Sequence, residues 1–214
     1  GRDRRGRAAA VAMQRAIRDL PSIVAPGGRV RLRQSMGLVD GELRLFRWQQ
    51  TGADPWVEVL PFGPDVSEVL RCEAQAAAGR LIVGQGGPTG DATTPLPGIE
   101  SSALLPPTLR RVLSEQARAE HRPVVLAFAQ LHRFERLDDT TLTSALAAVM
   151  DEVGSIQLEL GVNLLGTDVS PDGLKLILAT GVPTASHDDE ERLLAAAKRL
   201  AALDGTLSIR RSEE

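Results

Sequence analysis

The side chains best placed for chemistry lie at one tight turn in the second half of the chain. The turn reads Ser170-Pro171-Asp172-Gly173, in which proline presets φ and glycine accepts a positive φ. Asp172 therefore lies at a hairpin tip, where its carboxylate offers the hard oxygen ligands that Mg²⁺ prefers. The alternative is ordinary turn chemistry, and the spacing alone favours it, because Asp before Gly is common in hairpins.

Apolar strands must position this turn. A largely apolar run precedes it at 162–165, and LKLIL follows at 174–178 with Lys175 as its only charge. The second run is apolar enough for a central strand that is covered on both faces. The run VVLAFA at 124–129 predicts another buried strand. We therefore expect Asp172 beside the most buried strands of this half.

Helical spacing surrounds these strands. Apolar residues recur every three or four positions from Leu142 to Leu160 and predict a long helix from about residue 139. The pattern allows a break near Gly154, since glycine costs about 1 kcal/mol within a helix. A helix over 187–203 begins with four acidic residues that favour its positive end, and Ser186 is expected to cap it. A last strand is expected at 206–210.

The first half predicts a smaller set of elements. RVRLR at 29–33 alternates charged and aliphatic residues, which is typical of a strand with one solvated face. Asp40-Gly41 predicts a hairpin turn that joins this strand to ELRLFRW at 42–48. The other elements expected here are a helix over 7–20, a strand at 56–59, a helix from Pro64 to Gly79 and a strand at 80–83. We expect the helices at 7–20 and 187–203 to cover a mostly antiparallel sheet.

A linker separates the two halves. Residues 84–107 contain five Gly and five Pro, a density that opposes helices and sheets alike. A short helix is expected over 108–120. We therefore divide the chain into a first half at 1–83, a linker and helix at 84–120, and a second half at 121–214.

Composition narrows the class of protein. The net charge of −3 gives no reason to expect nucleic acid or a membrane surface as a partner. The single cysteine, Cys72, excludes an internal disulfide and fits a reducing cytoplasm, where we expect the protein. No apolar run approaches the roughly 20 residues of a membrane span. The three histidines, His121, His132 and His187, are scattered and more often surface side chains than metal ligands.

Several segments resemble class III nucleotidyl cyclase domains, the adenylate and guanylate cyclases. The hairpin followed by SHDDEERLL at 186–194 resembles one half of such a domain, and VVLAFAQLHRF at 124–134 resembles its first strand. PFGPDVSEVLR at 61–71 resembles a helix of the other half. The resemblance covers nearly the whole chain outside 84–120 and is closest to tandem cyclase domains of bacterial signalling proteins that continue into ATPase and repeat regions.

This resemblance implies an architecture. Residues 1–83 would be the C-terminal half of a first domain and residues 121–214 the N-terminal half of a second. The fold would be an α/β (α+β) sandwich, ferredoxin-like, with a mostly antiparallel sheet covered by helices. The two halves would complement each other within one chain, between chains, or stand as separate half-sheets.

The resemblance also implies a composite site with two Mg²⁺ ions and ATP or GTP. The family's metal-binding Asp residues correspond to Gln130 and Asp172, and its base-selecting Lys and acidic residue to Asp168 and Leu60. Its transition-state Asn and Arg correspond to Ser67 and Arg71. Only Asp172 and Arg71 keep the family's residue. Glu135 and Asp138 follow Gln130 and could replace its missing charge, although a helix start is their more frequent role.

We therefore expect a degenerate cyclase homology region that acts as a regulatory or interface module, without a firmly implied cofactor and with weak nucleotide binding allowed. Its partners would be a second cyclase-like half, in cis or in trans, and downstream ATPase or repeat domains. One alternative is an active adenylate or guanylate cyclase that uses Mg²⁺ with ATP or GTP. The other is a ferredoxin-like structural module with no nucleotide role.

Overall fold

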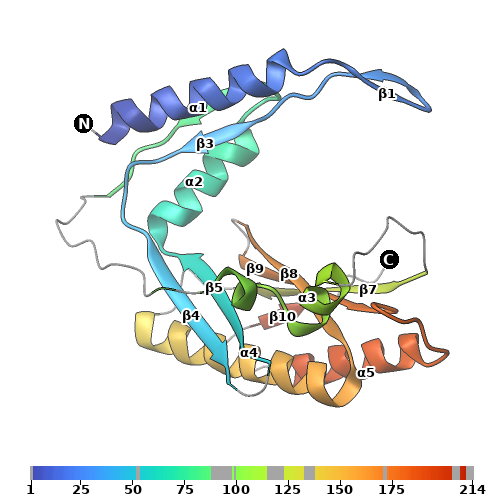
Figure 1. Ribbon diagram of the computed structural model, residues 1–214. Coiled ribbons are helices and arrows are strands. Elements are labelled where there is room, and N and C mark those ends of the chain that lie inside the picture. Colours follow the sequence, from blue (N-terminus) through green and yellow to red (C-terminus); the bar gives the residue numbers. More distant parts are fainter. Residues whose placement is uncertain are drawn as a thin grey trace. The chain divides into compact units, whose positions relative to one another are not determined.

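The chain folds into two compact units, each built from two segments. The computed structural model describes residues 2–51, 54–87, 98, 100–114, 123–132, 138–170, 173–203 and 208–210. The first unit comprises residues 1–44 and 62–93, and the second comprises residues 45–61 and 94–214 (Figure 1). The predicted boundaries at 83 and 120 stay a prediction, and the second of them lies outside the described residues.

The first unit joins two helices to short strands. It contains α1 (Arg2–Asp19), β1 (Ile23–Ala25), β2 (Gly28–Val30), β3 (Met36–Leu38), α2 (Pro64–Gln75) and β6 (Leu81–Val83). Strand β3 pairs in parallel with β6, and both contact α2. A Cβ atom on Gly37 would lie 2.2 Å from the carbonyl oxygen of Val69, so α2 can approach β3 this closely only at a glycine.

The prediction of a hairpin at Asp40-Gly41 is wrong. In the described residues β3 pairs with β6, whereas β4 (Arg44–Gln50) pairs with β5 (Trp56–Phe62). The backbone N–H of Glu42 instead donates to Oδ2 of Asp65 over 2.6 Å, which ties this loop to the first turn of α2. The acidic residue at the helix start, rather than a neighbouring strand, therefore binds the loop.

The second unit is built around a four-stranded sheet with one helix after its first strand and another after its third. The chain runs through β7 (Val125–His132), α4 (Asp139–Leu160), β8 (Asn163–Ser170), β9 (Gly173–Thr180), α5 (Asp189–Ala202) and β10 (Ser208–Arg210). The strands lie in the order β10-β7-β9-β8, and each neighbouring pair is antiparallel. The predicted strand at 124–129 and the pairing across the 170–173 turn are confirmed, as is the mixed α+β class. Of the strand predicted at 206–210, residues 208–210 are described and form β10.

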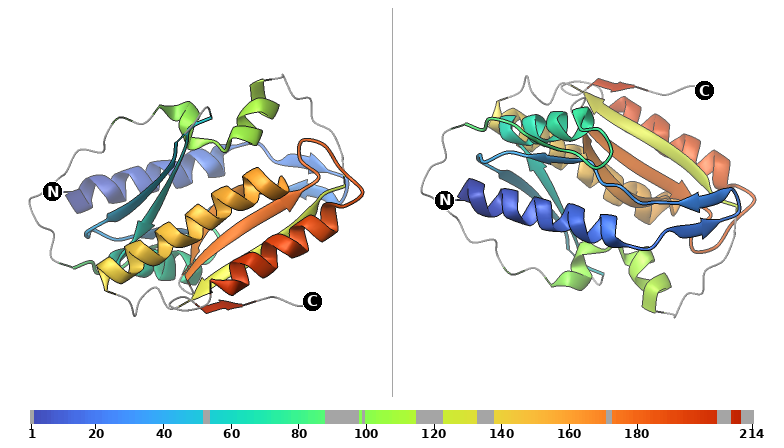
Figure 2. Two further views of the ribbon diagram at one scale, coloured as in Figure 1. Left: turned by 90° about the horizontal axis from the view of Figure 1, so that it is seen from below. Right: turned by 90° about the horizontal axis from the view of Figure 1, so that it is seen from above.

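Helices α4 and α5 cover one face of this sheet (Figure 2, left). Leu174, Leu176 and Leu178 of β9 point to that face and are at most 1% exposed. The helix that covers this sheet together with α5 is therefore α4. Helix α1 contacts β3 in the first unit, contrary to the expectation that the helices at 7–20 and 187–203 cover the same sheet. Other large apolar side chains of this unit are also at most 1% exposed: Leu131, Leu146, Met150, Val153, Ile156, Leu164 and Leu200.

The opposite face of the sheet is open. Register pairs Phe128 with Ile177 and Gln130 with Lys175, and paired residues share a face. Phe128 is 50% exposed and Leu126, two residues before it, is 47% exposed. An apolar strip therefore runs along the face that α4 and α5 leave uncovered.

Strands β4 and β5 join the second unit through two tryptophans. The rings of Trp48 and Trp56 meet edge to face with centroids 5.1 Å apart. A Cβ atom on Gly154 would lie 3.2 Å from the Trp48 ring. The helix break that Gly154 suggested does not occur, because α4 is continuous and this glycine makes room for the indole.

The second unit also contains η1 (Ser101–Leu104) and α3 (Pro107–Ser114). Part of the Gly/Pro-rich stretch, at 88–97 and 99, lies outside the described residues, as do residues 115–120 of the expected helix. None of the helices in the described part of the chain is both long enough and apolar enough to cross a membrane.

Candidate functional site

A row of three polar side chains crosses the open face of the second unit's sheet. Gln130 of β7 pairs in register with Lys175 of β9, and Lys175 pairs in register with Asp168 of β8. The ammonium Nζ of Lys175 lies 3.5 Å from Oδ2 of Asp168. The row is half-exposed, since the side chains of Lys175 and Asp168 are 35% and 56% exposed. The pair of Asp168 and Lys175 lies two register steps from the Ser170–Gly173 pair at the end of the hairpin.

Within this row, the side chains of Gln130 and Lys175 favour an anion over a metal ion. Gln130 is neutral, and its Nε2 atom is buried without a hydrogen-bond partner in the described residues. Its register neighbour Lys175 carries a positive charge, which repels a cation at this position. An amide N–H and an ammonium are donors, and both suit the oxygen atoms of a carboxylate or phosphate.

Of two further predicted positions, one lies outside the described residues and the other is apolar. Asp172, the carboxylate expected at the hairpin tip, lies outside the described residues. Leu60, which corresponds to the base-selecting acidic residue, lies in β5 and is 2% exposed. It contributes to the apolar core of the second unit.

Ser67 and Arg71 lie one turn apart on α2, in the first unit. The guanidinium of Arg71 forms an ion pair with the carboxylate of Glu68, three residues earlier on the same helix, and its side chain is 57% exposed. This contact matches an ordinary helix-surface arginine. The composite site that would join these residues to the second unit stays a prediction.

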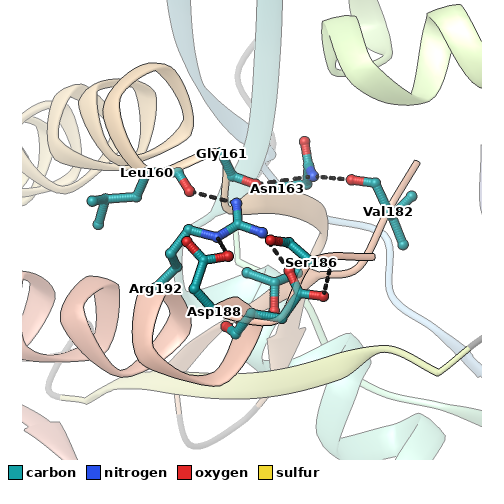
Figure 3. A network of polar contacts seen from close by, with 9 residues as sticks. Leu160, Gly161, Asn163, Val182, Ser186, Asp188 and Arg192 are labelled. Atoms are coloured by element: carbon teal, nitrogen blue, oxygen red, sulfur yellow. Dashed lines mark hydrogen bonds and ion pairs between the residues drawn. The ribbon is translucent and has the colours of Figure 1, made fainter. Parts of the chain in front are cut away.

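A network centred on Arg192 was not expected from the sequence (Figure 3). Its Nη1 donates to the carbonyl oxygen of Leu160 over 2.8 Å, at the end of α4, and its Nε donates to Oδ1 of Asp188 over 3.2 Å. Its Nη2 also donates to the carboxylate of Asp189, a residue that is only 7% exposed. The guanidinium thus joins the end of one helix to the start of the next.

The surrounding loop completes this network. The backbone N–H of Ser186 donates to Oδ2 of Asp189 over 2.9 Å. The N-cap residue of α5 is Asp188, so the expectation that Ser186 caps this helix is wrong. Hydrogen bonding from Ser186 and the charge of Arg192 hold the pKa of Asp188 below its ordinary value. Nδ2 of Asn163 donates to the carbonyl oxygen of Val182 over 2.7 Å. The acidic residues four and three positions before Arg192 were the sequence signal that could have revealed this cluster.

A partly buried carboxylate was also missed. Glu58 of β5 accepts a hydrogen bond from Oγ1 of Thr167 in β8 over 2.9 Å. Burial raises the pKa of Glu58, and the Thr167 hydroxyl opposes that rise. A single charge within the apolar run WVEVLPF was the signal in the sequence. This contact links the β4–β5 pair to the edge strand of the sheet.

No trio of His, Cys, Asp and Glu side chains in the described residues is arranged to hold a metal ion. Comparison with known proteins gives no relative: no protein-family model matches the chain, and no curated protein matches it.

Proposed function

We propose that this chain is a degenerate nucleotide cyclase homology region that acts as a regulatory or interface module of an intracellular signalling protein. Two features support the proposal. The second unit has βαββαβ connectivity and the strand order β10-β7-β9-β8, the arrangement of the ferredoxin-like motif. Cyclase homology is the finer part of the proposal, and it rests on the sequence motifs at 61–71, 124–134 and 186–194.

The row of Gln130, Lys175 and Asp168 is the observation that carries the inactive assignment. A two-metal displacement needs carboxylates that offset the charge of the ions. Here an uncharged amide occupies the first metal position, and the ammonium of Lys175 lies across from it in register. Asp168 is engaged with Lys175 and would repel a triphosphate. Losing one transition-state donor typically costs about 10²–10³ in rate, and several such losses act together.

Weak binding of a nucleotide is compatible with this proposal. The ammonium of Lys175 is a partly exposed donor that suits a phosphate oxygen, and the buried Nε2 atom of Gln130 beside it has no hydrogen-bond partner in the described residues. A module that binds nucleotide without turning it over would act through its contacts with a second cyclase-like half, in cis or in trans.

The test is an activity assay on the 214-residue chain with ATP or GTP and either Mg²⁺ or Mn²⁺. Products are separated by chromatography and identified by mass spectrometry. We expect no 3′,5′-cyclic nucleotide from the wild type. Cyclic nucleotide formation that Asp172→Ala abolishes would overturn the inactive assignment and favour the active cyclase.

A binding experiment separates the remaining alternatives. We expect a fluorescent ATP analogue to bind weakly, and Lys175→Met to weaken that binding at least severalfold, with Lys198→Met as the matched control on the exposed face of α5. An absence of nucleotide binding to the wild type would favour the structural module without a nucleotide role.

A further inference from the structure

The β1–β2 hairpin of the first unit exposes nearly all of its side chains. Register pairs Ile23 with Val30 and Val24 with Arg29. Ile23, Val24 and Val30 are 51%, 75% and 47% exposed, values that are high for aliphatic side chains. Figure 1 shows this hairpin beyond the end of α1, before the chain enters β3. A two-stranded hairpin with so little burial has little stability of its own.

Both edges of this two-stranded hairpin are unpaired in the described residues, and the β2 edge continues into residues 31–33. Strand β2 pairs with β1 alone among the described residues, and residues 31–33, which continue from it, pair with no described strand. An unpaired strand edge presents free N–H and C=O groups to another chain. Residues 28–33 are therefore a backbone template for an added strand.

The side chains along this edge alternate in charge. In an extended conformation Arg29, Arg31 and Arg33 lie on one face, and Val30 and Leu32 lie on the other. Arg31 and Arg33 are exposed, and no acidic side chain in the described part of the chain forms an ion pair with either. Leu32 is 44% exposed.

The first unit as a whole is also positively charged. The first unit contains 12 Arg, no Lys and eight Asp or Glu residues, a formal charge of +4. The second unit contains 13 Lys or Arg and 20 Asp or Glu residues, a formal charge of −7. The overall charge of −3 thus conceals a basic unit that attracts acidic partners.

The row of arginines along this edge disfavours a second copy of the chain and favours an acidic strand as its partner. If two copies paired through this edge, their arginines would face one another across the strands, and like charges directly opposite each other are destabilising. An extended strand with Asp or Glu at alternate positions places opposite charges there instead. Its intervening apolar residues then lie beside Val30 and Leu32.

We propose that residues 28–33 form the receiving edge for an extended acidic segment of a partner protein, which adds as a strand and alternates Asp or Glu with apolar residues. The backbone groups of the edge supply affinity, and the three arginines supply selectivity and register. This interaction lies in the first unit and is independent of the proposed nucleotide chemistry.

A synthetic peptide tests the proposal on the 214-residue chain. The probe is a fluorescein-labelled, C-terminally amidated peptide in which Glu alternates with Val, and binding is followed by anisotropy at rising NaCl concentration. We expect saturable, salt-sensitive binding, which the double variant Arg31→Glu and Arg33→Glu weakens about tenfold or more. The double variant Arg4→Glu and Arg5→Glu, an equal charge change at exposed positions of α1, should leave binding unchanged. Equal loss with this control would overturn the proposal.

Two further probes distinguish strand addition from general attraction. A peptide of the same sequence with methylated backbone nitrogens on alternate residues keeps the charges but loses hydrogen-bond donors. We expect it to bind at least tenfold more weakly, and equal binding would refute strand addition. If a single-stranded oligonucleotide or phosphatidylserine vesicles bind more tightly than the peptide and lose binding in the double variant, the edge serves an anionic polymer or surface and the proposal fails.

Discussion

The indole Nε1 of Trp48 in β4 donates a hydrogen bond to Oδ1 of Asp151 in α4 over 2.7 Å, although 103 positions separate the two residues. Trp48 is 8% exposed, and its ring also packs against Trp56. This pair of residues joins the β4–β5 strands to the longest helix of the second unit. Since Trp48 and Trp56 are the only tryptophans in the chain, their emission reports the unfolding of this unit.

Removing the acceptor should destabilise the second unit. We expect Asp151→Ala to lower the free energy of unfolding by about 1–3 kcal/mol, because a buried indole N–H then loses a charged partner. Asp151→Asn keeps an oxygen acceptor and should cost less. Urea denaturation followed by tryptophan emission measures both, with Ser144→Ala on the exposed face of α4 as the control. Equal stability of Asp151→Ala and the control would show that the hydrogen bond contributes nothing.

Filling the space at Gly154 should also destabilise the second unit. A methyl group there would lie 3.2 Å from the Trp48 ring, which Trp56 holds from the side. Overpacking costs about 1–3 kcal/mol and outweighs the roughly 1 kcal/mol that alanine gains in helix propensity. We therefore expect Gly154→Ala to lower the unfolding midpoint in urea. Gly166→Ala, at a site with no atom within 4 Å of the added carbon, should have little effect. A Gly154→Ala variant more stable than wild type would contradict this packing.

The carboxyl group of Glu58 should make stability depend on pH. Its pKa in the folded state is raised, chiefly by burial, so the folded state binds the proton more tightly than the unfolded chain. Glu58 therefore lowers the free energy of unfolding in a pH-dependent way. The loss is absent below the pKa of Glu58 in the unfolded chain, grows as pH rises through its pKa in the folded state, and is constant above that.

Glu58→Gln should therefore gain stability relative to wild type as pH rises from 4 to 8. The amide oxygen of Gln can still accept the hydrogen bond from Thr167. The measurement is urea unfolding of both proteins at each pH, and their difference removes the contribution of other groups. A difference that is flat with pH, or that falls, would be inconsistent with a raised pKa.

Arg192 should be the most sensitive cation of the second unit. Arg192→Met leaves the buried carboxylate of Asp189 without its cation and frees the carbonyl oxygen of Leu160, so we expect a loss of about 2–4 kcal/mol. Arg192→Lys should fall between this variant and wild type, because an ammonium lacks the planar array of donors. Lys198→Met, on the same helix and exposed, should cost under about 0.5 kcal/mol. Thermal unfolding ranks the three variants, and equal melting temperatures would exclude a joining role for Arg192.

The sequence by itself determined the elements whose cause is local. The 170–173 turn fixes β8 next to β9, since proline and glycine act on their own backbone angles and need no distant partner. The apolar spacing from Leu142 to Leu160 specifies α4, and the acidic run at 188–191 specifies where α5 begins. The absence of charge at Gln130 was likewise visible without a structure.

Only the tertiary structure decided which strands pair and what the polar residues contact. The turn signal at Asp40-Gly41 was misleading because a turn does not specify a partner, and Asp65 binds this loop from another segment. Gly154 could be recognised as a packing site only with Trp48 in place. The row of Gln130, Lys175 and Asp168 exists because three strands meet in register, a long-range pairing that no local preference encodes.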